Sequence, residues 1–258
     1  MQAYGIKLQL SGQLIGPDPG RLEATTSWEM PAENLTGSGS FSGNIEKLGF
    51  RHLVNTPEAV NFNGSIYHLF TKPELAGVAD WSSIHLPVQK TLYSNAGNIT
   101  VSSNFRSAHL KGNNILLLED WPKAPMQLDA LIDLQGVRID SYSLETLDGQ
   151  VRGSGQIDYS DGLQGKLVIN ATQINTGIIN SDLPGQLEFN SSLQIESADV
   201  FAINVDAAKA EIANRDFTGL GRVLWSGGKL TAINANINAG TNQLTADIKT
   251  WQAISRFG

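Results

Sequence analysis

The chain has 258 residues, of which 41% are hydrophobic and 17% are charged, so it is long and apolar enough to bury a core and is not a disordered protein. Its 18 basic and 25 acidic residues give a net charge of −7 without a cluster of Lys or Arg, which argues against nucleic acid as a partner. Cysteine is absent, which excludes disulfides and cysteine metal sites, and the residues contain neither a secretory signal nor an apolar run of transmembrane length.

Apolar and polar residues alternate along the N-terminal half of the chain, which is typical of half-exposed strands in an antiparallel sheet. The alternation is clearest in residues 4–10, 22–28 and 60–66. The segment from Asn44 to His52 is shorter and mixed, and it fits either one helical turn or a bulge before Pro57.

The same alternation predicts strands through the C-terminal half, at residues 126–134, 167–171, 187–189, 203–207 and 244–248. One segment is ambiguous. Residues 200–215 are rich in alanine, and Val200, Ile203, Ala207 and Ala210 would also share one face of a helix. We interpret this segment as a pair of strands.

A strand-and-turn phrase occurs twice, once from Gly153 to Gly162 and again from Gly219 to Gly228, so the chain contains weak repeat units around residues 147–163 and 213–230. Turn signals such as Asp148-Gly149 and Gly227-Gly228 separate the strands. No linker or charge run divides the chain, which predicts a single continuous domain over residues 1–258.

The close spacing of these turns predicts a meander in which each strand pairs with the next. Roughly sixteen to eighteen strands spaced at about 4.8 Å would extend for about 80 Å. Open sheets of this size twist and curl. The sequence therefore predicts an all-β fold, a long, curved, mainly antiparallel meander sheet curled into an elongated hydrophobic groove.

Such a groove would be lined by the apolar residues of each alternating segment. The predicted lining residues are Ile6, Leu8, Leu10, Phe62, Ile66, Leu128, Ala130, Ile132, Leu134, Ile157, Tyr159, Leu167, Ile169, Leu187, Phe189, Ile203, Val205, Val223, Trp225, Leu244, Ala246 and Ile248. The chemistry of this lining is burial of apolar surface, worth about 0.8 kcal/mol per methylene, without directional groups.

We predict no catalytic residue, no metal site and no cofactor. The four histidines, His52, His68, His85 and His109, occur without an HExxH motif or a nearby carboxylate and are expected at the surface or in turns. Asp129 and Asp133 share the face opposite Leu128 and Ile132, which predicts that they face solvent. The segment from Asp158 to Gly162 lacks the later glutamate of a calcium loop and is expected to form a hairpin turn.

Several phrases resemble the TamB family of the translocation and assembly module. They are FRHLVNTP (residues 50–57), GVADWSSI (77–84), LDGQVRGSG (147–155), LVINATQINTG (167–177) and FTGLGRV (217–223), and the resemblance runs from about residue 4 to residue 250. It implies a groove-forming sheet of the β-taco type in a non-enzymatic protein of the periplasm. The implied role is transport of phospholipid between the inner and outer membranes, with acyl chains as the bound groups.

The resemblance also implies an internal segment of a larger protein, since the N-terminal membrane anchor and the C-terminal partner-binding region of full-length members are not recognisable here. Contact with the outer-membrane barrel protein TamA is then expected through regions outside these residues. Two other functions remain open: a scaffold whose sheet edge templates strands of outer-membrane proteins, and a compact β-sandwich adhesin with a dry core.

Overall fold

The computed structural model describes residues 5–17, 20–56, 58–85, 92–119 and 121–249. The chain divides into two compact units, Met1–Asp133 (unit 1) and Leu134–Gly258 (unit 2). Seventeen strands account for most of the described residues of both units, in agreement with the expected number. The predicted all-β, antiparallel class is confirmed.

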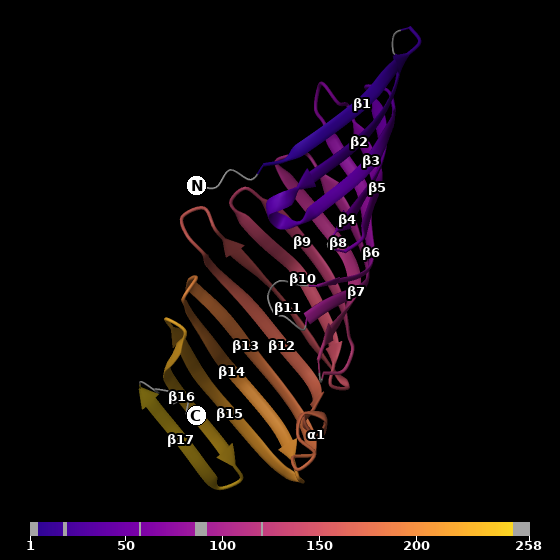
Figure 1. Cartoon of the computed structure of the whole chain (residues 1–258). Coiled ribbons are helices and arrows are strands. Elements are labelled where there is room, and N and C mark those ends of the chain that lie inside the picture. Colours follow the sequence, from indigo (N-terminus) through magenta and orange to yellow (C-terminus); the bar gives the residue numbers. More distant parts are fainter. Residues whose placement is uncertain (1–4, 18–19, 57, 86–91, 120, 250–258) are drawn as a thin grey trace, which may run out of the picture. The chain divides into compact units, whose positions relative to one another are not determined.

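The described part of unit 1 is an antiparallel meander in which every strand pairs with the next along the chain (Figure 1). A short 3-10 helix, η1 (Pro31–Glu33), joins β2 to β3. The strands are β1 (Lys7–Ile15), β2 (Arg21–Met30), β3 (Leu35–Gly43), β4 (Lys47–Thr56), β5 (Val60–Tyr67), β6 (Glu74–His85), β7 (Leu92–Ser103), β8 (Ser107–Leu118) and β9 (Ala124–Asp133).

Unit 2 continues the same plan, again with each strand antiparallel to the next. A single helical turn, α1 (Thr176–Ile179), lies between β12 and β13, and Figure 1 shows it at one end of these two strands. The strands are β10 (Gly136–Thr146), β11 (Gly149–Asp158), β12 (Gln164–Asn175), β13 (Gly185–Ser197), β14 (Val200–Ile212), β15 (Arg215–Ser226), β16 (Lys229–Ala239) and β17 (Asn242–Lys249).

Five hairpins of unit 2 turn through only two residues, and in three of them both residues have positive φ. They are Leu147 and Asp148, Ala213 and Asn214, and Gly227 and Gly228. This backbone conformation matches the right-handed twist of the flanking strands and is therefore favoured in tight hairpins. The turn predicted at Asp148-Gly149 is present, but its two central residues are Leu147 and Asp148, one position earlier than predicted.

The interpretation of residues 200–215 as a pair of strands was wrong. These residues form one long strand, β14, a two-residue turn and the first residue of β15. A bulge between Val205 and Ala208 moves the inward positions from odd to even residue numbers. The change of phase therefore occurs within a single strand and does not divide it.

The ambiguous segment that starts at Asn44 contains a turn and the first half of β4, without a helical turn among its described residues. The side-chain oxygen of Asn44 accepts hydrogen bonds from the backbone N–H groups of Glu46 (3.0 Å) and Lys47 (2.9 Å). Asn104 makes the same pair of bonds in the turn between β7 and β8. Asparagine side chains that bond their own backbone in this way stabilise tight turns.

Candidate functional site

The strand register gives unit 1 one continuous apolar face. Residues directly opposite each other in an antiparallel pair point to the same side of the sheet, so pairs on successive strands form cross-strand rows. Four rows make up this face: Leu8, Trp28, Gly37, Val54, Val60, Trp81 and Gly97; Leu10, Thr26, Gly39, His52, Phe62, Ala79, Ile99, Gly112 and Leu128; Gly12, Ala24, Phe41, Phe50, Gly64, Gly77, Val101, Leu110 and Ala130; Leu14, Leu22, Gly43, Leu48, Ile66, Leu75, Ser103, Ala108 and Ile132.

Two tryptophans lie flat on this face because a glycine is opposite each of them. A Cβ atom on Gly37 would lie only 2.6 Å from the ring of Trp28, and one on Gly97 would overlap the ring of Trp81. Glycine thus leaves room for the indole to lie across the neighbouring strand instead of standing away from the sheet. The result is a broad and shallow apolar surface.

Polar atoms on the apolar face of unit 1 are paired with these tryptophans. The indole N–H of Trp28 donates to Nε2 of His52 (2.7 Å), and the two rings are parallel, with centroids 6.0 Å apart. The indole N–H of Trp81 lies 3.0 Å from Oγ of Ser94, which also accepts from the amide of Asn114 (2.6 Å). Ser94 is almost fully buried, so these bonds satisfy a hydroxyl that would otherwise destabilise the fold.

The pKa of His52 is lowered by burial, which disfavours its charged form. The hydrogen bond from Trp28 has the same requirement, because Nε2 can accept a hydrogen bond from the indole N–H only when it carries no proton of its own. Both effects keep His52 neutral and apolar in character on this face.

Unit 2 has an apolar face of its own, which also consists of cross-strand rows of paired residues. Its rows combine aliphatic residues with alanine and glycine, for example Ile169, Ser191, Val205, Gly221, Ala235 and Ala246. The best-buried part is a cluster of Leu147, Ala171 and Ile174, against which Val151, Leu187 and Phe189 pack.

Nearly all predicted lining residues lie in strands, and within each unit they share one face. On the apolar face of unit 1 are Leu8, Leu10, Phe62, Ile66, Leu128, Ala130 and Ile132. On that of unit 2 are Ile157, Leu167, Ile169, Leu187, Phe189, Ile203, Val205, Val223, Trp225, Leu244, Ala246 and Ile248. Ile6, Leu134 and Tyr159 lie outside the strands, immediately before β1, after β9 and after β11.

Part of this apolar surface is exposed to solvent. The exposed fraction is 64% for Leu8, 68% for Leu10 and 63% for Leu244. Large contiguous exposed apolar surfaces are rare on monomeric soluble proteins and usually mark a site for a protein, a lipid or another apolar partner. The two faces are therefore the strongest candidates for a functional site.

The sequence reasoning missed two concave regions of unit 1, which are lined mostly by residues of the opposite, polar face and partly by residues of the apolar rows. The larger has a volume of about 690 Å³ and the smaller about 450 Å³, and strands β1–β3 contribute to both. The larger region is lined by Gln9, Leu10, Ser11, Thr25, Thr26, Ser27, Ser38, Gly39, Ser40, Arg51, His52, Leu53, Asn61 and Asn63. Hydroxyl and amide side chains dominate this list, so the region is polar and open, unlike an acyl-chain site.

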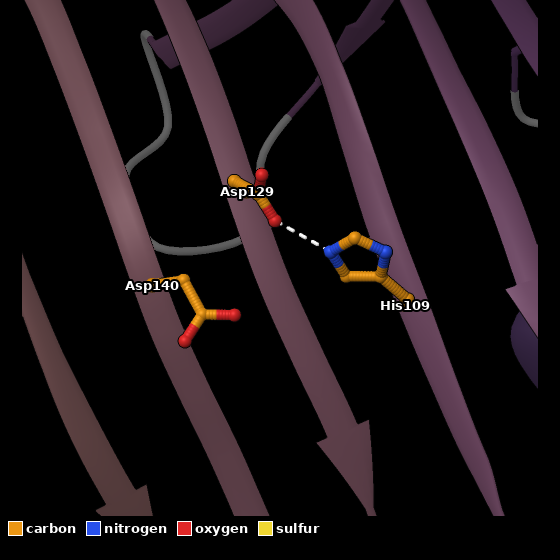
Figure 2. Close-up of side chains that lie close together, drawn as sticks. All are labelled: His109, Asp129 and Asp140. Atoms are coloured by element: carbon orange, nitrogen blue, oxygen red, sulfur yellow. Dashed lines mark hydrogen bonds and ion pairs between the residues drawn. The ribbon is translucent and has the colours of Figure 1, made fainter.

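His52 was placed wrongly from sequence, since it lies on a strand of the apolar face. His109 is at the surface as expected, but on β8, and next to a carboxylate that the sequence did not predict. Figure 2 shows the hydrogen bond between Nε2 of His109 and Oδ1 of Asp129 (2.5 Å), on the polar face of unit 1. Lys111 lies 3.3 Å from the other oxygen of Asp129. These contacts, chiefly the bond from His109, lower the pKa of Asp129. Asp129 therefore has two basic partners on this face, His109 and Lys111.

In unit 2, the turn from Asp158 to Gly162 is held by hydrogen bonds from the backbone N–H (2.9 Å) and the hydroxyl (2.7 Å) of Ser160 to the carboxylate of Asp158. These bonds lower the pKa of Asp158, the hydroxyl bond contributing most. The carboxylate is thus engaged in the turn itself, and the segment forms the hairpin turn expected from the sequence.

The family comparison agrees with the strand pattern. A family model described as "TamB, N-terminal domain" matches residues 2–252, which is nearly the whole chain. The chain belongs to the TamB family. Neither the curated proteins nor the solved structures contain a match to it.

TamB proteins are non-enzymatic transport and assembly components of the cell envelope. In this TamB chain, the described residues include no helix that is both long and apolar enough to cross a membrane.

Proposed function

We propose that this TamB segment is a conduit for phospholipid in the periplasm, between the inner and outer membranes. Acyl chains would lie against the apolar faces while polar head groups stay in water. The observation that carries the proposal is the continuity of these faces. In unit 1, the four apolar rows run unbroken from β1 to β6, and three of them run on to β9.

The dimensions of the face support acyl chains as its ligand. Four rows, from Leu8 to Leu14 along β1, span about 20 Å at about 3.4 Å per residue. One leaflet of a bilayer contributes about half of a hydrocarbon core that is about 30 Å thick. The apolar face is therefore deep enough for a phospholipid chain that lies along the strands.

The flatness of the face supports movement rather than tight binding. Trp28 and Trp81 lie across glycines, so neither ring forms a wall between one strand and the next. Burial of methylenes is non-directional and changes little as a chain slides from one row to the next. A continuous shallow surface therefore favours transport over capture in one pocket.

Native mass spectrometry with lipid extraction tests this proposal on protein purified from a bacterial periplasm. We expect phospholipid to co-purify with the chain, and Ile132→Asp or Ile169→Arg to abolish it by placing a charge on the apolar face. Val168→Arg is the matched control, because Val168 neighbours Ile169 on β12 but points to the opposite face and is 48% exposed. Folded, lipid-free wild-type protein, or equal loss in the control, would contradict the conduit.

A second function, templating of strands during outer-membrane protein assembly with TamA, is favoured by β1. Every residue of this strand is exposed, and β2 is the only described strand of unit 1 with which it pairs. Long apolar edge strands readily add a further strand. Under this function, Gln9→Pro should block client binding while Ile132→Asp leaves it intact, as measured by crosslinking to a nascent barrel protein. If the segment is a conduit, Ile132→Asp should abolish lipid binding and Gln9→Pro should leave it intact.

A further inference from the structure

We infer that a phospholipid on unit 1 lies in one orientation, with its glycerol and ester groups toward the row of Trp28 and Trp81 and its chain ends toward the opposite margin. This inference rests on the proposed conduit and adds to it the direction of the bound molecule. It comes from an asymmetry between the two ends of the strands.

All three tryptophans of residues 1–133 lie toward the same end of the strands, which we call the tryptophan margin. Trp28 on β2 and Trp81 on β6 occupy one cross-strand row, linked through Gly37, Val54 and Val60. Trp121 lies in the turn from β8 to β9, which is at the same end, and is 48% exposed.

The polar side-chain atoms that are paired with tryptophan on the apolar face also gather near this margin. His52 accepts from Trp28, and Ser94 lies at the centre of the bonds from Trp81 and Asn114. Each indole thus combines a large apolar ring with a polar atom, near one end of the strands.

The opposite end, which we call the aliphatic margin, has a different composition. Its row contains Leu14, Leu22, Leu48, Ile66, Leu75 and Ile132. The hydroxyl of Ser103, in the same row, is engaged within its turn by Ser107 and Phe105.

The turns at the aliphatic margin also carry apolar side chains without polar atoms. Ile45, Phe70 and Phe105 lie in three of these turns and are 43%, 79% and 56% exposed. At the tryptophan margin, by contrast, one of the turns carries Trp121. The turns therefore differ between the two margins in the same way as the rows do.

This asymmetry matches the polarity of a phospholipid. Tryptophan is enriched where hydrocarbon meets the polar interface of a membrane, because its ring is apolar and its N–H is a donor. Ester carbonyls are acceptors that lose free energy when they are buried among purely aliphatic groups. The tryptophan margin suits the ester level of the lipid, and the aliphatic margin suits the ends of its chains.

Depth-dependent fluorescence quenching tests the orientation in the full chain. Variants that keep only Trp28, or only Trp81, with the other tryptophans changed to phenylalanine, report on the tryptophan margin. Ile66→Trp in a tryptophan-free background reports on the aliphatic margin, and Leu75→Trp replaces it if that variant does not fold. Each protein is loaded with phosphatidylcholine that is brominated either near the ester groups or near the methyl ends of its chains.

We expect Trp28 and Trp81 to be quenched more by bromine near the esters, and the tryptophan at position 66 or 75 more by bromine near the chain ends. Equal quenching by both lipids, or the reverse order, would overturn the orientation and leave the conduit standing. If no tryptophan is quenched and no lipid is retained, the conduit itself fails and the orientation with it.

Discussion

Unit 1 and unit 2 form apolar faces from the same alternating pattern, but the faces are built from different side chains. In unit 1, aromatic rings lie over glycines, as Trp28 does over Gly37 and Trp81 over Gly97. Unit 2 has one such pair, Tyr142 over Gly153, but its rows consist mainly of aliphatic residues and alanine, and a buried cluster around Leu147 and Ile174 packs at one end of the strands. Unit 1 therefore relies more on rings laid over glycines, and unit 2 relies more on aliphatic side chains and alanine.

The difference has consequences for stability. A ring that lies across a glycine loses this contact when the glycine is replaced by a larger residue. Substitution of these glycines should therefore destabilise unit 1. Unit 2 has conventional buried side chains, so truncation of those side chains should destabilise it. Substitutions matched between the units separate these two modes.

The largest effect is expected in unit 2, at Leu147. Leu147→Ala should destabilise the protein by about 2–4 kcal/mol, because it removes the centre of a buried cluster. Leu147 also has a φ of +53°, which a residue with a Cβ atom adopts at a cost of about 1 kcal/mol. Leu147→Gly should therefore be milder than Leu147→Ala by about that amount, in spite of its smaller side chain.

Urea denaturation gives the two free energies of unfolding, and hydrogen exchange in β10–β13 assigns the loss to unit 2. If the glycine variant were less stable than the alanine variant, the left-handed turn conformation of Leu147 would be wrong. The matched measurement in unit 1 is the exchange of β2–β6, which neither substitution should accelerate.

The next effect isolates the glycine contacts of unit 1. Gly97→Ala should destabilise by about 1–3 kcal/mol, because the added methyl overlaps the ring of Trp81 and forces it to move. Gly219→Ala is the control in unit 2, where the nearest atom would be 3.3 Å from the new Cβ and a small shift accommodates it. Its free energy of unfolding should stay within about 0.5 kcal/mol of wild type. Equal effects at the two positions would contradict the distinction between the units.

The sequence predicted much of this architecture, because alternation reports directly on strands and on which residues share a face. The pairing of Phe62 with Ala79, or of Ile169 with Ser191, then follows from short hairpins that fix the register. Even the two residues chosen for charge substitution, Ile132 and Ile169, lie on the apolar faces of their units.

Features that depend on the exact register or on a bulge could not be predicted. The bond between Trp28 and His52 joins strands that are two apart in the sheet, and no local pattern relates residues so distant in sequence. The same holds for His109 and Asp129, which lie on neighbouring strands. The bulge in β14 leaves no composition signal, since alanine occupies both phases of the alternation.

A smaller, pH-dependent effect is expected at the contact between Trp28 and His52. Burial lowers the pKa of His52 below its ordinary value of 6.5, so the unfolded chain takes up a proton at a higher pH than the folded chain does. The resulting stability is fully present above about pH 6.5 and is lost as the pH falls from there through the folded pKa. Urea midpoints measured between about pH 8 and pH 5 should decline in the wild type.

His52→Phe removes both the titration and the acceptor of the indole N–H. We expect a loss of about 1 kcal/mol at pH 8 and a shallower decline toward pH 5. A double-mutant cycle with Trp28→Phe isolates the bond itself. A decline as steep in His52→Phe as in the wild type would show that other groups cause the pH dependence.

The smallest effect is expected on the polar face of unit 1, at Asp129. The hydrogen bond from His109, with Lys111 as a second partner, lowers the pKa of Asp129, so its contribution is present above the ordinary value of 3.8 and disappears as the pH falls through the folded pKa. Asp129→Asn should therefore differ slightly from the wild type near pH 6 and not at all near pH 2 in urea midpoints. Glu23→Gln breaks the exposed pair with Arg21 on β2 and is the control for a single surface ion pair. Because Asp129 has two partners and Glu23 is paired only with a neighbour on its own strand, the change near pH 6 should be larger at Asp129. An equal change would mean that the second partner of Asp129 adds nothing to a simple surface pair.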